Sequence, residues 1–409
     1  DRACMAVRMV LAADGTKISH RFTRGLMRSR ASLSYEQAQA AIDGEANPAT
    51  DDLLNPVLRP LWAAYRALVQ AREARQPLAL ELPERRIELD KAGQVTSVAF
   101  RERFDAHKLI EECMVLANVA AAETLVEKKS PLLFRVHEEP SVEKMETLRE
   151  VAKAAGLNLA KGQVLQTRHL NSLLQQAAGR DDAELINLST LRAMTQAYYS
   201  PQNFGHFGLA LRNYAHFTSP IRRYADLIVH RALIAAHGWG KDGLSPADAE
   251  NLEDTAKLIS EAERRSMAAE RDTVDRYLAS YLSDRVGSEF AGRISGIARF
   301  GVFVKMDETG ADGLVPIRSL GTEYFLHDAE ANTLTGRDTG TVIAMGQRVL
   351  VRLSEATPIT GGLLLELLEI DGETRKPARR THRGRPVKAA KGRTRAKAAK
   401  AKIKSARKR

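Results

Sequence analysis

The apolar residues of this chain change their spacing at about residue 288, and this change constrains the fold more than any other feature. Before it, long segments repeat apolar residues at helical spacing, most clearly in 107–128, at positions 109, 110, 113, 116, 117 and 120. After it, residues 288–370 form short β-rich runs separated by glycine. The sequence therefore predicts an α+β chain: a helix-rich domain over 1–285, a small all-β barrel over 286–370 and a basic tail over 371–409.

Turn residues and periodicity also predict the individual elements. Two hairpins are expected in the first domain, one about Asp14-Gly15 and one about residues 91–94, and a strand is expected over 132–137. Helices are expected to begin at about Ser34 and to cover about 50–75, 107–128, 142–156, 168–199, 220–237 and 247–284. Five barrel strands are expected over 288–298, 301–306, 313–317, 347–356 and 363–370.

Charge is distributed very unevenly along the chain. The segment from Arg375 to Arg409 holds 17 of the 62 basic residues and no acidic residue, so the remaining 45 bases face 51 acids, a net charge of −6. The tail has almost no large apolar side chain and is predicted to be disordered in isolation. Its charge favours binding of a polyanion without sequence preference, while a solubilising tail is the alternative.

Cysteine usage and hydropathy limit the compartment. Cys4 and Cys113 are the only cysteines, which excludes a disulfide framework and a multi-cysteine zinc site. No segment approaches the roughly 18–20 consecutive apolar residues of a membrane span. We therefore expect a cytoplasmic protein without a membrane partner, and a monomer.

Two adjacent arginines follow a strong helix-start signal. Ser219 supplies a capping hydroxyl and Pro220 favours the first helical position, which predicts a helix beginning at Pro220. Arg222 and Arg223 then fall in the first turn, where the helix dipole disfavours cations, and this predicts an anion site suited to phosphate. Pairing with acids from elsewhere in the chain is the alternative. The buried stripe is predicted to consist of Ile221, Tyr224, Leu227 and Ile228, and another face to carry Arg222, Asp226 and His230.

The segment around these arginines, GHFGLA…YAHFTSPIRRYADLIVHRAL, resembles the signature of the ribonuclease II / ribonuclease R family, the RNB exoribonucleases. Further blocks of this resemblance follow the same order, namely DRACM, RASLSY, HKLIEECMVLANVAAAETLVEK, LLFRVHEEPS and AERD. The resemblance covers residues 1–370. It implies Mg²⁺-dependent, processive 3′→5′ hydrolysis of RNA to 5′ mononucleotides in a channel of the catalytic domain. It also implies RNA, and the ribosome or RNA-decay machinery, as partners.

The same resemblance implies roles for single residues. Arg222 matches the arginine that holds the phosphate at the cleavage site, and Glu270 matches an acidic residue near the leaving end, although a solvated surface acid is the alternative. Tyr35 matches a tyrosine that packs on the 3′-terminal nucleotide, with a core aromatic as the alternative. The remaining RNA contacts implied in this domain are Glu111, His216 and Arg223. Residues 77–84 contain no aromatic to match a base-stacking residue of ribonuclease II.

The family's metal ligands have no counterpart in this sequence. Members carry a cluster D-x-x-x-x-x-D-x-D-D upstream of the DR block, which binds magnesium through oxygen ligands. Here the chain begins at Asp1-Arg2, and neither Asp51-Asp52 nor Asp181-Asp182 has that spacing. We expect a C-terminal portion, without the family's two cold-shock barrels, that is weakly active or inactive alone. Alternatives are a non-catalytic RNA-binding protein and, from the tail alone, a DNA- or chromatin-binding protein.

The spacing of Gly292, RFGVFVKM, GADGLVP and Leu320 resembles the S1 RNA-binding domain, an OB-fold barrel. Phe300 and Phe303 are the candidates for base stacking, with core positions as the alternative. Strand alternation would place them on opposite faces unless a bulge occurs at Gly301. Pro316 stands where many such domains have histidine, and His327, in a predicted loop, is a candidate replacement. The segment is net acidic, so stacking or the tail must supply its RNA affinity.

Overall fold

The computed structural model describes residues 1–45, 47–80, 85–100, 102–161, 165–180, 183–329 and 332–374. The predictions for Asp181-Asp182, for residues 81–84 and for the tail from residue 375 onward lie outside these ranges. Within these ranges no helix is both long enough and apolar enough to cross a membrane.

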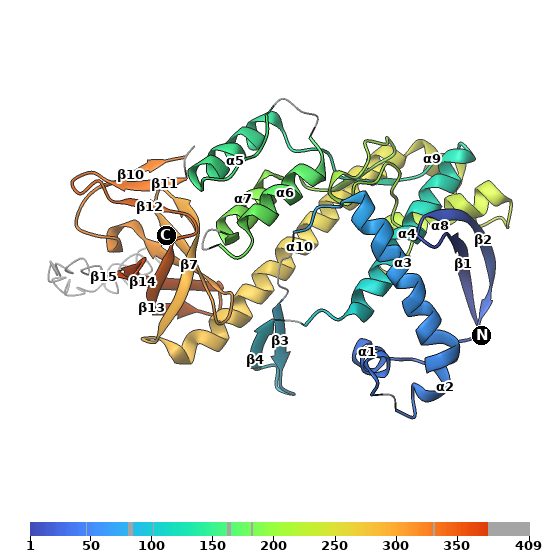
Figure 1. Cartoon of the computed structure of the whole chain (residues 1–409), viewed down its shortest axis with the longest axis horizontal. Helices are drawn as coiled ribbons and strands as arrows, with labels where there is room; N and C mark the ends of the chain where they lie inside the picture. The colour runs from blue at the N-terminus through green and yellow to red at the C-terminus, as the bar shows by residue number, and fades with distance from the viewer. Residues whose placement is uncertain are drawn as a thin grey trace, which may run out of the picture. The chain divides into compact units, whose positions relative to one another are not determined.

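The chain begins with an antiparallel hairpin, as predicted (Figure 1). Strand β1 (Arg2–Leu11) pairs with β2 (Lys17–Met27). Its turn lies against a helix, because a Cβ on Gly15 would lie only 2.0 Å from the carbonyl oxygen of Ala67. The elements that follow, up to residue 154, are α1 (Tyr35–Asp43), α2 (Asp51–Leu53), the π-helical turn Leu54–Leu58, α3 (Arg59–Arg75), β3 (Arg85–Leu89), β4 (Val95–Phe100), α4 (Asp105–Glu127), β5 (Phe134–Val136) and α5 (Val142–Ala154).

Residues 168–199 are largely helical, as predicted, but the segment forms two separate helices and its end belongs to a strand. Helix α6 (Thr167–Ala177) and helix α7 (Ala183–Ala193) are followed by β6 (Tyr198–Ser200). Gly179 adopts a positive φ of 76° just beyond α6, which a helix interior does not allow. Strand β6 pairs with β5, so a partner more than 60 residues away overrides the local helical pattern.

Small side chains bring α4 close to α8 (Tyr224–His237). Ala117, Ala120 and Ala121 of α4 share one buried cluster with residues of α8 that include Val229 and Leu233. Fully burying a valine or leucine side chain such as Val229 or Leu233 contributes about 1.5–3 kcal/mol. From this packed pair, Asn118 holds the segment before α8: its Nδ2 donates to the hydroxyl of Tyr214 (3.0 Å) and its Oδ1 accepts from the amide of Phe217 (2.8 Å).

A single helix, α10 (Leu252–Leu282), packs against both parts of the fold (Figure 1). It follows the short α9 (Pro246–Glu250). Near its start, α10 buries Leu252, Ala256 and Ser260, which repeat at i, i+4 and i+8. At its end it buries Leu278, Ala279 and Leu282 in the core of the barrel.

The barrel is closed and has the five strands that the sequence predicts, each within one residue of its expected bounds. These are β7 (Glu289–Ala298), β8 (Gly301–Met306), β9 (Asp312–Pro316), β13 (Arg348–Thr357) and β14 (Gly362–Ile370), with β15 (Glu373–Thr374) beside β14. Strand order is β13-β7-β8-β9-β14, and pairing of β13 with β14 closes it. The predicted α+β class, a helix-rich part followed by this barrel, is confirmed.

Sequence analysis missed a small sheet inserted between β9 and β13. It consists of β10 (Phe325–Asp328), β11 (Thr333–Gly336) and β12 (Val342–Ala344). Each strand has only three or four residues, too few to show an alternating pattern. His327, predicted in a loop, instead lies in β10.

Candidate nucleic-acid interface

The two arginines do not lie in the first turn of a helix, so the predicted start at Pro220 is wrong. Helix α8 begins at Tyr224 and Arg223 is its N-cap residue. Residues 219–223 form a turn, called the arginine turn below, in which the carbonyl oxygen of Ser219 accepts from the amides of Arg222 (3.3 Å) and Arg223 (3.0 Å). The side chain of Asp226 accepts from the amide of Ser219 (2.7 Å) and fixes this turn from the helix side.

The predicted buried stripe of this helix is also mostly wrong. Ile221 is 99% exposed, and Tyr224 and Leu227 are exposed as well. Only Ile228 of the predicted stripe is buried. The buried face is set by packing against α4 and α10, and its members are Ala225, Asp226, Ile228, Val229, Ala232, Leu233 and Ile234.

Arg223 is held by Asp226, which is completely buried. Its Nη2 donates to Oδ1 at 2.8 Å, and its Nε lies 2.8 Å from Oδ2, outside hydrogen-bond alignment. Arg223 therefore pairs with an acid, which is the alternative to the phosphate site predicted for the two arginines. This contact fixes the guanidinium in one place beside the turn.

Arg222 differs from its neighbour, because its side chain is exposed and has no ion-pair partner among the residues that the structure describes. It lies near enough to His216 to help lower the pKa of that imidazole. An exposed guanidinium beside a fixed one is well placed to bind an oxyanion.

Beside the turn, His216 belongs to a group of aromatic rings. The hydroxyl of Tyr199 and Nδ1 of His216 share a hydrogen bond of 2.9 Å, and the guanidinium of Arg135 lies 4.7 Å from the centre of the Tyr199 ring. Burial, reinforced by the charges of Arg223 and Arg135, lowers the pKa of His216 to about 2. Burial raises the pKa of Tyr199 to about 12, so both groups are neutral at pH 7.

The structure brings Glu263, which sequence analysis missed, to this group. Its carboxylate lies 2.6 Å from Nη1 of Arg135. Glu270 is exposed and lies seven residues further along α10, two turns or about 10 Å away on the same side of the helix. There it lines a groove of about 500 Å³ with Arg85 and Tyr277. Its catalytic assignment stays a prediction.

Tyr35 contacts helix α4, and Glu111 belongs to the same helix. The ring of Tyr35 stacks on His107, with centroids 4.0 Å apart and planes 22° apart, and Tyr35 remains 37% exposed, so it is not a core aromatic. Glu111 stands one turn after His107 and pairs with Arg103 and with Arg72, the latter at 3.9 Å. Both side chains are partly exposed, and their roles stay predictions.

Phe300 and Phe303 both lie on the barrel surface, 57% and 36% exposed, with ring centres 5.9 Å apart and planes nearly perpendicular. Both rings reach the surface without a bulge at Gly301, which pairs in register with Ala298. Phe300 precedes β8 and lies in a turn, so strand alternation does not apply to it. The bulge lies in the neighbouring strand, between Ile294 and Gly296.

The described residues do not provide a metal site of the kind the family resemblance implies. No group of three or more His, Cys, Asp or Glu side chains within the described ranges could hold a metal ion. Asp51 and Asp52 are exposed at the start of α2.

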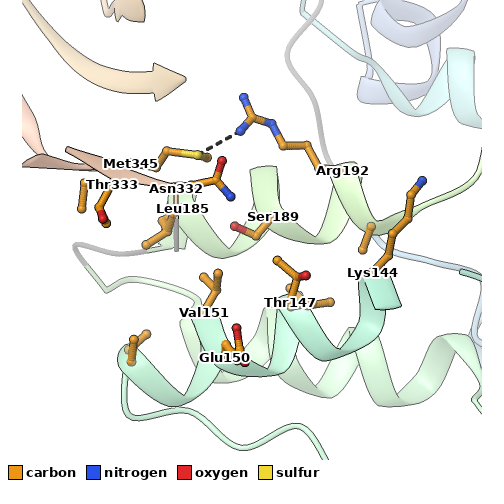
Figure 2. A pocket seen from close by; sticks show the side chains of 15 residues that line it. Lys144, Thr147, Glu150, Val151, Leu185, Ser189, Arg192, Asn332, Thr333 and Met345 are labelled. Atoms are coloured by element: carbon orange, nitrogen blue, oxygen red, sulfur yellow. Dashed lines mark hydrogen bonds between the residues drawn. The ribbon is translucent and has the colours of Figure 1, made fainter. Parts of the chain in front are cut away.

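A cavity of about 540 Å³ lies between α5, α7 and the inserted sheet of the barrel (Figure 2). Its walls are mainly apolar. Its two cations are already engaged: Nζ of Lys144 donates to the carbonyl oxygen of Met194 (3.2 Å), and Arg192 donates to the carbonyl oxygen of Ser295 (2.6 Å) and to Sδ of Met345 (2.9 Å). The cavity is therefore not an anion site, and Arg192 joins α7 to the barrel.

Comparison with protein-family models assigns both parts of the fold. Residues 1–238 match the RNB domain and residues 283–372 match the S1 RNA-binding domain. The chain belongs to the RNB family. The RNB region thus contains Arg222, Arg223 and His216, and the S1 region contains Phe300 and Phe303. The predicted boundaries at residues 285 and 370 stay predictions.

Among curated proteins, this RNB-family chain is similar to ribonuclease R of Escherichia coli (strain K12), with 35% identity over 364 residues, covering 86% of this chain and 44% of that protein. Ribonuclease R of Aquifex aeolicus (strain VF5) is 36% identical over 373 residues, covering 90% of this chain and 52% of that protein. The apo form of Mycoplasma genitalium RNase R has a TM-score of 0.83 at 28% identity, covering 90% of this chain and 58% of that one. The chain spans about half the length of the curated relatives it matches.

Buried histidines should make this RNB-family fold sensitive to acid. Burial, and then nearby positive charge, lowers the pKa of His216 to about 2, and burial with His137 beside it lowers that of His206 to about 3, from 6.5. Because both values are lower in the folded state, the unfolded chain binds protons first as the pH falls below 6.5. We expect the urea midpoint to fall between about pH 6.5 and pH 5, above the range where carboxylates titrate.

A single substitution checks this expectation. In the His216→Asn variant, unfolding should take up about one proton fewer per molecule. The free energy of unfolding, and with it the urea midpoint, should therefore fall less steeply as the pH is lowered. A urea midpoint that stays constant over this range would contradict the assignment of neutral, buried imidazoles.

Proposed function

We propose that this chain is the RNA-holding part of a 3′→5′ exoribonuclease that hydrolyses RNA to 5′ mononucleotides with Mg²⁺. The observation that carries this proposal is the exposed guanidinium of Arg222, without an acidic partner among the described residues, beside the fixed guanidinium of Arg223. The similarity to proteins named ribonuclease R supports it. RNA as ligand is supported by the S1 match and by the M. genitalium RNase R solved with single-stranded RNA, TM-score 0.82.

The local geometry suits stabilisation of a phosphate that gains negative charge. Arg223 keeps its position through Asp226, so its field acts on the site without reorganisation during the reaction. Arg222 is free to contact the phosphate oxygens directly. The imidazole of His216 is neutral at pH 7, so it does not act there as an imidazolium general acid.

The magnesium ligands of this proposed enzyme lie outside the described residues. We therefore expect the 409-residue chain to bind a 3′-labelled oligo(A) and, with Mg²⁺ added, to release almost no labelled mononucleotide. Ready release by this chain would show that it supplies its own metal ligands. A non-catalytic RNA-binding role, the alternative, predicts that activity also stays absent when the upstream segment of a ribonuclease R relative is joined to Asp1.

In the barrel, base stacking should contribute to RNA affinity. Phe300→Ala and Phe303→Ala should each weaken binding of oligo(A) by about 1–3 kcal/mol for each base that loses its aromatic stacking partner. Tyr324→Ala is the matched control, because Tyr324 is also an exposed aromatic of this region, at 67% exposure. Fluorescence anisotropy measures all three affinities. Equal losses for all three variants would show that Phe300 and Phe303 are not a specific stacking site.

A further inference from the structure

A second cationic site lies in a pocket of about 450 Å³ between α3, α6 and the segment that leads to the arginine turn. The side chains that matter for its chemistry are Arg75, Arg168, Arg212, Glu139, Phe204 and His206. The pocket lies apart from Arg222 and Arg223, neither of which lines it.

Three arginines from three elements converge on this pocket. Arg75 ends α3, Arg168 lies in the first turn of α6 and Arg212 precedes the arginine turn. Among the described residues that line the pocket, one carboxylate, that of Glu139, lies beside them. Since residues 1–374 carry a net charge of −6, this local excess of positive charge is unusual for the chain.

The charges of these arginines are poorly neutralised. Arg212 is exposed and has no ion pair within the described part of the chain, and Nε of Arg168 contacts only the ring nitrogen of His169, at 3.5 Å. Nε and Nη2 of Arg75 are buried without a hydrogen-bond partner, and burial lowers the pKa of this guanidinium. The nearest carboxylate, of Glu112, lies 3.8 Å from Nη2 and already accepts from Arg72 at 2.5 Å.

Besides cations, the pocket offers a surface for a base. Phe204 is 56% exposed at its wall, and an exposed aromatic face stacks on any nucleobase. The N-terminus of α6 also lines the pocket, through Gln166 and Thr167, so the positive end of the helix dipole adds to the potential there. His206 is neutral and its Nδ1 accepts from the amide of Leu209 (3.2 Å), so the arginines supply the charge.

From this geometry we propose that the pocket of Arg75, Arg168 and Arg212 binds a nucleotide through its phosphate, with the base against Phe204. The choice of a nucleotide rests on the proposed function, whereas the anion site rests on the arginines alone. His206, Tyr214 and His216 separate this pocket from Arg222, with successive ring centres 5.2 Å and 5.7 Å apart. The two phosphate sites can therefore be occupied independently.

The experiment measures binding of AMP to the whole chain in an Arg222→Ala background, which removes any contribution of the proposed catalytic arginine. Isothermal titration calorimetry compares AMP, inorganic phosphate, adenosine and an oligo(A) without terminal phosphates. The test variant adds Arg168→Glu and Arg212→Glu, both at exposed positions. The matched control adds Arg59→Glu and Arg66→Glu, two exposed arginines of α3 with the same change of charge.

We expect the test variant to bind AMP at least tenfold more weakly, because removing one charge-assisted hydrogen bond to the phosphate weakens binding by about tenfold or more. The control should bind AMP as the parent does, and adenosine should bind much more weakly than AMP. Loss for both AMP and oligo(A) would support an RNA strand in the pocket, and loss for AMP alone would support a free mononucleotide. Unchanged AMP binding in a test variant with a native circular dichroism spectrum, or absence of AMP binding in the parent, would overturn the proposal. Since Arg222 is absent throughout, neither result depends on its catalytic role.

Discussion

Replacement of Arg222 by alanine should slow RNA hydrolysis by at least about 100-fold, because removing one donor to the charge that develops on the phosphate costs about 10²–10³ in rate. RNA affinity should change less than about threefold, since we propose that the barrel and the arginines outside the turn also bind the strand. This separation follows from the structure: Arg222 is exposed, holds no other described group in place and can be removed without unfolding the turn.

A fusion allows this measurement. Residues 1–374 are joined behind the segment of E. coli ribonuclease R that precedes its match to Asp1, and single-turnover hydrolysis of labelled oligo(A) is followed with Mg²⁺. Arg66→Ala, an exposed arginine on α3, is the control and should keep the parent rate. Normal turnover of the Arg222→Ala fusion would refute the assignment of the phosphate contact.

Asp226→Ala should lower the free energy of unfolding by about 3 kcal/mol, at the lower end of the range for breaking a buried ion pair. The carboxylate is completely buried and contacts both the guanidinium of Arg223 and the amide of Ser219 (2.7 Å). Its loss leaves a partly buried cation and a backbone donor without partners. The side chain of Arg223 is 24% exposed and can still reach water, which keeps the loss from being larger.

Urea unfolding of Asp226→Ala and Asp242→Ala provides the comparison. Asp242 also pairs with an arginine, Arg24, at 2.5 Å, but that pair lies in solvent and its removal should have a much smaller effect. Similar losses in the two variants would show that burial of Asp226 does not set its contribution. Tight RNA binding by a folded Asp226→Ala would further show that Arg223 needs no fixed position.

The five barrel strands could be predicted from the sequence, because they are short β-rich runs separated by glycine. The inserted sheet could not, since strands of three or four residues carry no readable period. The strand at the end of 168–199 required knowledge of β5, whose pairing with Tyr198–Ser200 outweighs local helix preference. Local patterns are decisive only where no distant partner competes with them.

The candidate site, too, could be predicted from the sequence only in part. Arg222 and Arg223 stand out in the sequence because they follow Ser219 and Pro220, and the phosphate prediction needs only that segment. Their different states could not be read there, because Asp226 looks like one more polar residue on a helix face. Arg135 and Glu263 are 128 residues apart in the chain and meet only through packing of β5 and α10.

The continuous helix α10 also fixes a length scale for the ligand. Near Ser260 the helix contacts β6, because the Oγ of Ser260 accepts from the amide of Tyr199, whose hydroxyl bonds to His216 beside the arginine turn, and the barrel core begins at Leu278. Ser260 and Leu278 are 18 positions, or about 27 Å, apart along one rigid helix. A stacked strand advances about 3.4 Å per nucleotide, so about eight nucleotides cover this distance. If RNA follows the helix, as the proposed function implies, this spacing sets the shortest strand that reaches from beside the turn to the barrel, and affinity measured over a length series of oligo(A) should rise at about eight nucleotides.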